Sequence, residues 1–402
     1  MGYNMPPTRN GFNMFDCVSL LQKSCRRGLN EYAGFAACEL FSAYNTAMWN
    51  RITFVSCEDC SGALTKEIIK LRYEDIEANK GKKGYFRDTS YVSKAVYLLT
   101  HSNKSRDACY FACNFIIASE YNKTKNYHLE DSEIFAFQCS VDSIPKNVFT
   151  KEYMVSGPDS FSISSDSQEG MFGCPEYPSG NEYRAAATMK KAILEGDMET
   201  AGYSQNYLRK SHRSLVWKTL YLTAYELGGE LCREIIGLSL ADDFINSKRE
   251  FERKDEIFSS KAIMLLSYIV HGMNENIISQ ECIKPLEFVD FSDIEYPDIM
   301  NCTLPNGEFP EWVFDCHTIR GKQNGKNDWQ MNVDEQAALT PLKLGFFDEG
   351  TWQSLYEWLK DNDAMQPGKF LSPGEYEEHL AYRKGRYNNP LTKDGAVSND
   401  CC

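Results

Sequence analysis

The sequence lacks an excess of positive charge. Its 402 residues include 43 lysine and arginine residues against 57 aspartate and glutamate residues, which gives a formal net charge of −14 at pH 7. A protein that coats nucleic acid needs a cationic face for the phosphates. This balance argues against that class of protein and leaves room only for a local basic patch.

The chain also lacks long hydrophobic runs and a leader segment. No window has the apolar length needed to cross a bilayer, and the first thirty residues hold no apolar core like that of a signal peptide. The 15 cysteines are scattered and odd in number, which disfavours a disulfide framework. We therefore expect a cytoplasmic, intracellular protein with reduced thiols and no membrane contact.

What is present is the composition of a globular protein. Hydrophobic residues make up 42% and charged residues 25% of the chain, which disfavours wholesale disorder. A length of 402 residues suggests two or three domains with a substantial core.

A sequence repeat organises the chain. Residues 49–62, WNRITFVSCEDCSG, correspond to residues 217–229, WKTLYLTAYELGG, with the two tryptophans 168 positions apart. The same offset relates other identical residues: Asn13 and Asn181, Lys23 and Lys191, Gly28 and Gly196, Glu31 and Glu199, Glu58 and Glu226. After one deletion the offset becomes 167, as in Glu67 and Glu234 or Ser93 and Ser260. We infer an internal duplication of a domain of roughly a hundred residues.

Both copies have helical periodicity. In copy one, residues 13–120, apolar positions such as Phe15 and Val18 fall on one face before Gly28, which suits a helix end. In copy two, residues 181–285, Trp217 begins an apolar stripe with helical spacing. Further helices are expected at about 64–79, 89–119, 230–248 and 255–273. The predicted fold is mainly α: a tandem helical duplication with an irregular and helical C-terminal region.

The segments outside the copies have other patterns. Residues 1–12 are polar and predict a loose start. In the linker, residues 121–180, alternation of Phe135, Phe137, Cys139 and Val141 predicts a strand, and a Ser, Gly and Pro-rich stretch follows. Residues 286–402 predict a loop followed by two helices, one carrying Trp352 and Leu355 and one opening at 372–375 and ending in a basic run at 383–386.

The repeat motifs resemble those of a known family. In copy one, a helix with Lys23, Ser24 and Arg26 precedes an alanine-rich helix; Arg51, Ile52, Glu58, Asp59 and Gly62 follow. This order resembles the C-terminal helical region of the MgsA/RarA replication-associated recombination ATPases, relatives of clamp loaders. One residue is inserted before Gly62, and in copy two Thr219 and Leu227 replace the arginine and the aspartate.

The ATPase core of that family has no counterpart here. No segment fits G-x-x-x-x-G-K-[ST]; residues 321–326, GKQNGK, have the wrong spacing and no hydroxyl after the lysine. The resemblance therefore implies a collar-like helical module for assembly, without ATP hydrolysis. It also implies a homo-oligomer or a pseudo-dimer within the chain, and nucleic acid or replication and repair proteins as partners.

Glu58 and Glu226 are the acidic residues that the two copies share within the core motif. Two such carboxylates, if they face each other, can perform acid–base chemistry or hold a cation. The alternative is that each carboxylate accepts hydrogen bonds from a helix start or pairs with a nearby base.

Cys57 and Cys60 have the spacing of zinc ligands, and Cys109 with Cys113 could complete a set of four thiolates. However, copy two carries Tyr225 and Gly228 at the equivalent places. Buried thiols that act as small hydrophobic residues are the favoured interpretation, so no metal site is predicted.

The segment 312–326 has the composition of a chemical site. It carries Asp315, His317, Arg320, Lys322 and Lys326 around two glycines. Such a loop can bind a phosphate, with a histidine positioned by the aspartate for proton transfer. A surface loop whose histidine orders local structure is the alternative, and a nucleophilic Cys316 is a third.

A basic group surrounds the tryptophan of copy two: Arg209, Lys210, His212, Arg213 and Lys218. Together with Arg51 and the basic residues of copy one it could line a nucleic-acid groove, whereas solvated helix faces explain it equally well. The leading hypothesis is a non-ATPase interaction protein of DNA replication, recombination or repair. The alternative is an enzyme that acts on a nucleotide or nucleic-acid phosphate at residues 315–326. The sequence identifies no cofactor.

Overall fold

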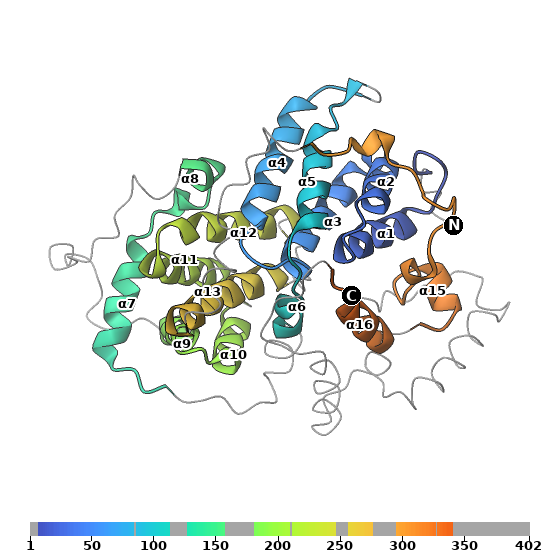
Figure 1. The fold of residues 1–402 in the computed structure, drawn as a ribbon. Helices are drawn as coiled ribbons and strands as arrows, with labels where there is room; N and C mark the ends of the chain where they lie inside the picture. The colour runs from blue at the N-terminus through green and yellow to red at the C-terminus, as the bar shows by residue number, and fades with distance from the viewer. Residues whose placement is uncertain are drawn as a thin grey trace. The chain divides into compact units, whose positions relative to one another are not determined.

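The computed structural model describes residues 7–83, 86–112, 127–156, 181–209, 211–246, 256–275, 295–326 and 328–340. Within these ranges it contains fifteen α-helices and no β-strand, which confirms the expected mainly α fold class (Figure 1). Several predictions lie outside the described residues: those for Cys113, Lys210, the Ser, Gly and Pro-rich stretch, and the two helices after residue 341. In the described part of the chain, no helix combines the length and apolar character that crossing a membrane requires.

The chain divides into two compact units. Unit 1 comprises residues 1–60, 71–106 and 290–402, and unit 2 comprises residues 61–70 and 107–289. Most of copy one therefore shares a unit with the segment that follows copy two, whereas copy two shares a unit with the linker segment.

Unit 1 is built on helices from copy one. Its α-helices are α1 (Met14–Arg26), α2 (Asn30–Phe41), α3 (Asn45–Glu58), α4 (Thr65–Ala78) from residue 71 onward, α5 (Ser90–His101), α15 (Ile319–Gln323) and α16 (Asp328–Ala337). It also contains the 3-10 turns η7 (Ile299–Asn301) and η8 (Glu311–Val313). Asn13 caps α1 by accepting a hydrogen bond from Phe15 N at 2.9 Å. Gly28, with φ of 65°, ends the helix as its sequence position predicts.

The core of unit 1 lies where α1 packs against α2, α3 and α5 (Figure 1). Leu20, Leu40 and Ile52 are fully buried there. Gly34 on α2 has a packing role, because a Cβ at this position would lie 2.3 Å from Cys302 Sγ, beside η7. The small residue therefore admits the C-terminal segment of the unit onto α2.

Unit 2 is a second helical body. Its α-helices include α6 (Asp107–Phe111), α7 (Asp131–Ser143), α8 (Lys151–Ser156), α9 (Asn181–Glu195), α10 (Met198–Arg209), α11 (Arg213–Leu227), α12 (Glu230–Asn246) and α13 (Ile257–Glu275). The 3-10 turn η4 (Lys146–Val148) joins α7 to α8. The helix α9 packs on α10, and α11 packs on both α12 and α13. Trp217 and Leu220, from the stripe predicted for copy two, are buried in this core.

The strand predicted at residues 135–141 is wrong, since these residues belong to α7. The buried positions are Ile134, Phe137, Gln138 and Val141, which have the spacing of one helix face. A capping box between Glu130 and Glu133 starts the helix. The alternation of apolar residues concealed a helical pattern in which Gln138 takes a buried place.

The long helix predicted at 89–119 is interrupted. The helix α5 ends at His101, because Ser102 takes an extended conformation (φ −68°, ψ 152°), and α6 begins at Asp107. In the intervening segment Lys104 forms an isolated bridge with Cys60. The ammonium group of Lys104 donates to the carbonyl oxygen of Leu99 at 2.7 Å, so it satisfies one of the carbonyls left open at the end of α5.

Candidate functional site

Unit 1 contains a buried cluster of charged side chains, which we call the Arg26 cluster. It contains five basic and four acidic residues: Lys23, Arg26, Arg27, Arg51 and Arg106 with Glu58, Asp59, Asp315 and Glu335. Lys23 and Arg26 lie three residues apart on α1 and therefore share a face. Glu58 ends α3 and Asp59 is its C-cap, so the end of one helix faces the end of another within the unit.

Arg26 is the central member. Its guanidinium binds three carboxylates: Nη2 lies 3.0 Å from Glu58 Oε1, Nη1 lies 3.0 Å from Glu335 Oε2, and Nε donates to Asp59. Lys23 connects this group to the C-terminal loop, since its Nζ lies 2.9 Å from Asp315 Oδ2 and 3.4 Å from Glu335 Oε1. The cluster thus holds α1, the end of α3, α16 and the loop together.

Neutral groups add further hydrogen bonds to the cluster. The amide nitrogen of Gln22 donates to Glu58 Oε2 and to Asp59 Oδ2, each at 3.0 Å. Arg51 donates to the amide oxygen of the same glutamine. Arg106 donates to the carbonyl and side-chain oxygens of Asn332 at 3.1 and 2.9 Å. Because most lone pairs and N–H groups have partners, the buried charges are compensated.

The electrostatics keep three of the four carboxyl groups ionised. Burial opposes the ionisation of Glu335, but the charges of Arg26 and Lys23 outweigh it and lower its pKa to about 2. For Asp315, burial is outweighed by a hydrogen bond from His317 and by Lys23, and its pKa is well below the ordinary value. Arg26 and Arg106 likewise lower the pKa of Glu58 against burial. A carboxylate with a depressed pKa is a weak proton acceptor at neutral pH, so these groups are poorly suited to acid–base catalysis.

Asp59 differs from the other carboxyl groups. It is fully buried, and this burial raises its pKa above the ordinary value despite the charge of Arg26; the neighbouring Glu58 carboxylate acts in the same direction as burial.

Side-chain hydrogen bonds and a close backbone contact fix the conformation of the loop after Asp315. Asp315 Oδ1 accepts a hydrogen bond from the backbone N–H of His317 at 2.8 Å, and Thr318 Oγ1 caps α15 by accepting from Gly321 N at 3.0 Å. A Cβ on Gly321 would lie 1.8 Å from the carbonyl oxygen of Asp315, so only glycine fits. Gly325, with φ of 73°, follows the helix end. Both glycines that suggested a phosphate loop therefore have local structural reasons.

The cations of this loop differ in their surroundings. The half-exposed Arg320 forms an ion pair with Glu311, and its guanidinium lies 4.2 Å from the centre of the Phe314 ring. Lys322 lies in α15 and Lys326 follows it, and both are partly exposed.

The structure brings His317 close to two neighbours in the sequence. The Nδ1 atom of His317 lies 3.5 Å from Asp315 Oδ1 and 3.3 Å from Cys316 Sγ. The predicted Asp–His contact is thus an ion-pair distance, longer than a good hydrogen bond. The imidazole is 51% exposed, whereas Cys316 is buried.

Glu58 and Glu226 belong to different units, and each pairs with a base in its own unit. Glu58 pairs with Arg26. Glu226 is 43% exposed and accepts from Lys190 Nζ at 2.6 Å. These contacts are those of the alternative interpretation, in which each glutamate neutralises a nearby base.

The basic residues around Trp217 also have acceptors within unit 2. Arg213 donates to Asp242 at 2.7 Å and to Asp243 at 2.9 Å, and Lys218 donates to the carbonyl oxygen of Val141 at 3.2 Å. Arg209 pairs with Glu256. Their charges are therefore largely balanced within the unit, which weakens any groove for phosphates.

Of the four cysteines considered as zinc ligands, Cys113 lies outside the described residues. Cys57 and Cys60 are buried in unit 1, and Cys109 belongs to unit 2. In the described ranges, Asp315, Cys316 and His317 form the one group of three potential ligands.

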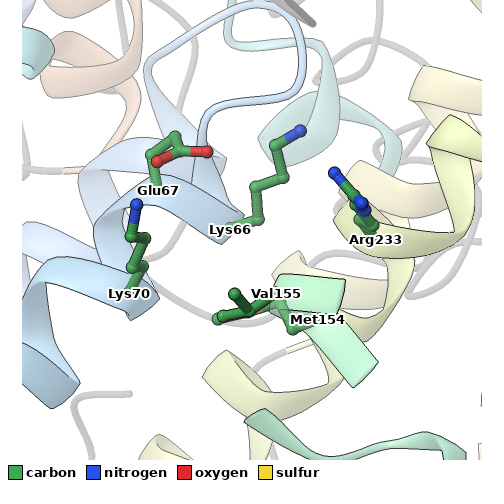
Figure 2. A pocket seen from close by; sticks show the side chains of 6 residues that line it. All are labelled: Lys66, Glu67, Lys70, Met154, Val155 and Arg233. Atoms are coloured by element: carbon green, nitrogen blue, oxygen red, sulfur yellow. The ribbon is translucent and has the colours of Figure 1, made fainter. Parts of the chain in front are cut away.

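Unit 2 has a small cationic pocket that sequence reasoning missed. It is a hollow of about 300 Å³, open solvent included, with Lys66, Glu67 and Lys70 from α4, Met154 and Val155 from α8, and Arg233 from α12 (Figure 2). Glu67 lines the same hollow as the three cations, and Arg233 Nη2 donates to the carbonyl oxygen of Ser156 at 3.1 Å. The i, i+4 spacing of Lys66 and Lys70 was the available signal, but nothing in the sequence placed Arg233 opposite them.

Two details fix α4 beside this pocket. The buried Glu234 accepts from the backbone nitrogens of Thr65 at 2.9 Å and Lys66 at 3.1 Å, and so caps the start of α4. Gly237 permits the approach, because a Cβ there would lie 2.7 Å from Lys66 Cα. Burial raises the pKa of Glu234 against the opposing charge of Lys66.

No protein-family model, curated protein or solved structure matches the chain. The resemblance to the recombination ATPases therefore stays a prediction, and the function of the chain has to be inferred from its own residues and their contacts.

Proposed function

We propose that this chain is a non-ATPase interaction protein of DNA replication, recombination or repair that assembles with partners through two duplicated helical domains. The observation that carries the proposal is a set of hydrogen bonds present in both units. In unit 1, Trp49 Nε1 donates to Asp75 Oδ2 at 2.9 Å, and Asn79 Nδ2 donates to Asp75 Oδ1 at 2.9 Å.

Unit 2 has the same set at the matching positions. Trp217 Nε1 donates to Asp242 Oδ2 at 3.0 Å, and Asn246 Nδ2 donates to Asp242 Oδ1 at 2.6 Å. The tryptophans are related by the offset of 168, and the aspartates and asparagines by the offset of 167. Agreement in six residues, in both position and contact, supports a duplication of one helical domain.

The contacts of the candidate catalytic residues favour interaction over catalysis. Asp315, which would orient His317 in the enzyme alternative, is bound to Lys23 in the Arg26 cluster. Glu58 is bound to Arg26, and Glu226 to Lys190. A general base needs a lone pair directed at its substrate, and these carboxylates direct theirs at internal cations.

Among the proposed partners, proteins are favoured over nucleic acid. The net charge of −14 repels a phosphate backbone, and Arg213 and Lys218 donate to acceptors within unit 2. The replication and repair context itself depends on the motif resemblance in copy one.

The test combines the mass of the full chain in solution with direct binding assays. We expect light scattering during size-exclusion chromatography to give a mass above that of one chain, rising with concentration, or a stable complex with a purified replication protein. DNA binding, followed by fluorescence anisotropy, should be weak and should vanish at raised salt. A strict monomer that binds neither DNA nor replication proteins would overturn the proposal.

The enzyme alternative has its own assay. The full chain and the His317→Ala variant are incubated with nucleotides and with nucleic acid, and released phosphate is measured. We expect no turnover by either protein. Turnover that disappears in the variant would replace the interaction proposal with the enzyme alternative.

A further inference from the structure

The donor atoms beside the loop resemble a metal-ligand set more than a catalytic pair. Asp315, Cys316 and His317 place their ligand atoms within 4.8 Å of one another. A fourth donor comes from α16, where Met331 Sδ lies 3.8 Å from Cys316 Sγ. A thiol, an imidazole and a thioether therefore meet in unit 1.

The distances from Cys316 Sγ to the other two donor atoms are compatible with a shared ion. Metal bonds of about 2.3 Å to sulfur and about 2.0 Å to nitrogen place neighbouring ligand atoms roughly 3.3–4 Å apart. The Cys316 Sγ to His317 Nδ1 distance is 3.3 Å, and the Cys316 Sγ to Met331 Sδ distance is 3.8 Å. Both distances from Cys316 Sγ fall within this range.

We propose that Cys316, His317 and Met331 form a three-ligand site for Cu(I). Thiolate and thioether sulfur atoms are soft ligands that select this ion, and imidazole also suits copper. The carboxylate of Asp315 is not needed as a ligand, since Lys23 and the backbone N–H of His317 already occupy it. It holds the loop that carries the two central ligands.

Charge favours a monovalent ion at this site. When the ion binds, the Cys316 thiol releases its proton to solvent. The resulting thiolate and Cu(I) form a neutral pair, whereas a divalent ion would leave one positive charge beside the buried side chain. The adjacent Asp315 carboxylate is already paired, since its Oδ2 lies 2.9 Å from Lys23 Nζ, so it does not neutralise a second positive charge. An unpaired positive charge near a buried ion pair would destabilise the metal-bound protein.

Exposure provides a route for the ion. The imidazole of His317 is 51% exposed, whereas Cys316 is 5% exposed. An incoming ion would meet the imidazole first and then exchange its remaining ligands for the two sulfur atoms.

The chain contains a matched control pair. Cys38 Sγ lies 3.7 Å from Met300 Sδ, almost the spacing of the proposed site. There, however, Arg9 Nη1 donates to Cys38 Sγ at 2.6 Å, so a cation already occupies the thiol. The paired variant Cys38→Ser/Met300→Leu therefore removes two sulfur atoms without touching the proposed site.

The experiment titrates reduced, full-length protein with Cu(I), without oxygen, against a coloured Cu(I) chelator. Because other thiols can bind copper weakly, the readout is the number of tightly bound equivalents in each variant. We expect the wild type and the control to hold one equivalent that Cys316→Ser lacks. Met331→Leu and His317→Ala should keep the fold, checked by circular dichroism, and weaken binding at least about tenfold.

Three outcomes would overturn the site. One is an equal number of tightly bound equivalents in the wild type and in Cys316→Ser. A second is loss of the tight equivalent in the control variant. The third is wild-type affinity in Met331→Leu or in His317→Ala, which would indicate a different ligand set, or displacement of copper by Zn²⁺, which would indicate a divalent ion.

Discussion

Glu58 in unit 1 and Glu226 in unit 2, which the sequence offset of 168 relates, have different surroundings. In unit 1, Glu58 and Asp59 belong to a buried ion cluster centred on Arg26. In unit 2, the equivalent of Glu58 is Glu226, which forms a single ion pair with Lys190 and is 43% exposed. A glutamate at the related position thus lies among several charges of a buried cluster in unit 1 and at the surface with one cation in unit 2.

The accompanying replacements explain this difference. Counting by the repeat offset, Leu194 stands where Arg26 stands, Leu227 where Asp59 stands, and Thr219 where Arg51 stands. A buried charge that loses its partner is destabilising, whereas an apolar replacement of both partners is tolerated. The residues of such a cluster therefore stabilise the fold only when they are present together. Unit 1 has the whole cluster, and unit 2 has one surface ion pair in its place.

Removing Arg26 should give the largest effect. Arg26→Met leaves Asp59, Glu58 and Glu335 without their shared cation, so unit 1 should lose about 3–5 kcal/mol of stability. Hydrogen exchange followed by mass spectrometry would report each unit separately. Lys190→Met is the matched control and should change unit 2 by less than about 1 kcal/mol.

A double replacement sharpens this test. Arg26→Leu/Asp59→Leu reproduces the residues of unit 2 and should be less destabilising than Arg26→Leu alone. If the double variant were as unstable as the sum of its single variants, the cluster would not behave as a set.

Acidification should remove stability from unit 1. The folded-state pKa of Glu335 lies at about 2, below its ordinary value of 4.5. Its contribution is therefore present above about pH 4.5 and is lost as the pH falls toward 2, roughly 3 kcal/mol in all. Denaturation of the wild type and of Glu335→Gln at a series of pH values would measure it, with Glu226→Gln as the exposed control. A Glu335→Gln profile as steep as the wild-type profile would contradict this assignment.

The tryptophans should give equal, intermediate effects in both units. Trp49→Phe and Trp217→Phe each remove the indole N–H donor from a buried aspartate, at a cost of about 1–3 kcal/mol. Unequal losses by hydrogen exchange, beyond about 1 kcal/mol, would argue that the two hydrogen-bond sets are not equivalent.

The smallest effect is expected at the surface pair of unit 2. Glu226→Gln removes a partly exposed ion pair and should cost about 1 kcal/mol or less, and the cost should fall further at high salt. A larger loss in thermal denaturation would mean that Glu226 has a role beyond pairing with Lys190.

The sequence predicted most helices whose apolar residues follow helical spacing, although the helix expected at 89–119 is interrupted after His101. The pattern correctly predicted the helix that contains Trp217 and the helices near 64–79 and 230–248. Gly28 correctly predicted the end of α1. The pattern failed at α7, where Gln138 occupies a buried position and apolar residues happen to alternate. A polar residue type predicts exposure, so the sequence did not indicate that Gln138 is buried.

The sequence predicted only some members of the candidate site, and it did not predict their contacts. The sequence identified Asp315, His317 and Glu58 as candidates from their residue types. It contained no sign that Lys23 joins Asp315 to Glu335, or that Met331 lies beside Cys316. These partners come from separate helices, and their distances depend on how those helices pack.

Local spacing of apolar residues was enough to predict the mainly helical fold class, and the position of Gly28 predicted the end of α1. Which charges neutralise one another depended instead on how the helices pack. Ion pairs within the Arg26 cluster join residues up to 309 positions apart, and only folding brings such residues within hydrogen-bonding distance. Folding thereby directed most of the candidate acids and bases toward stabilising their own units.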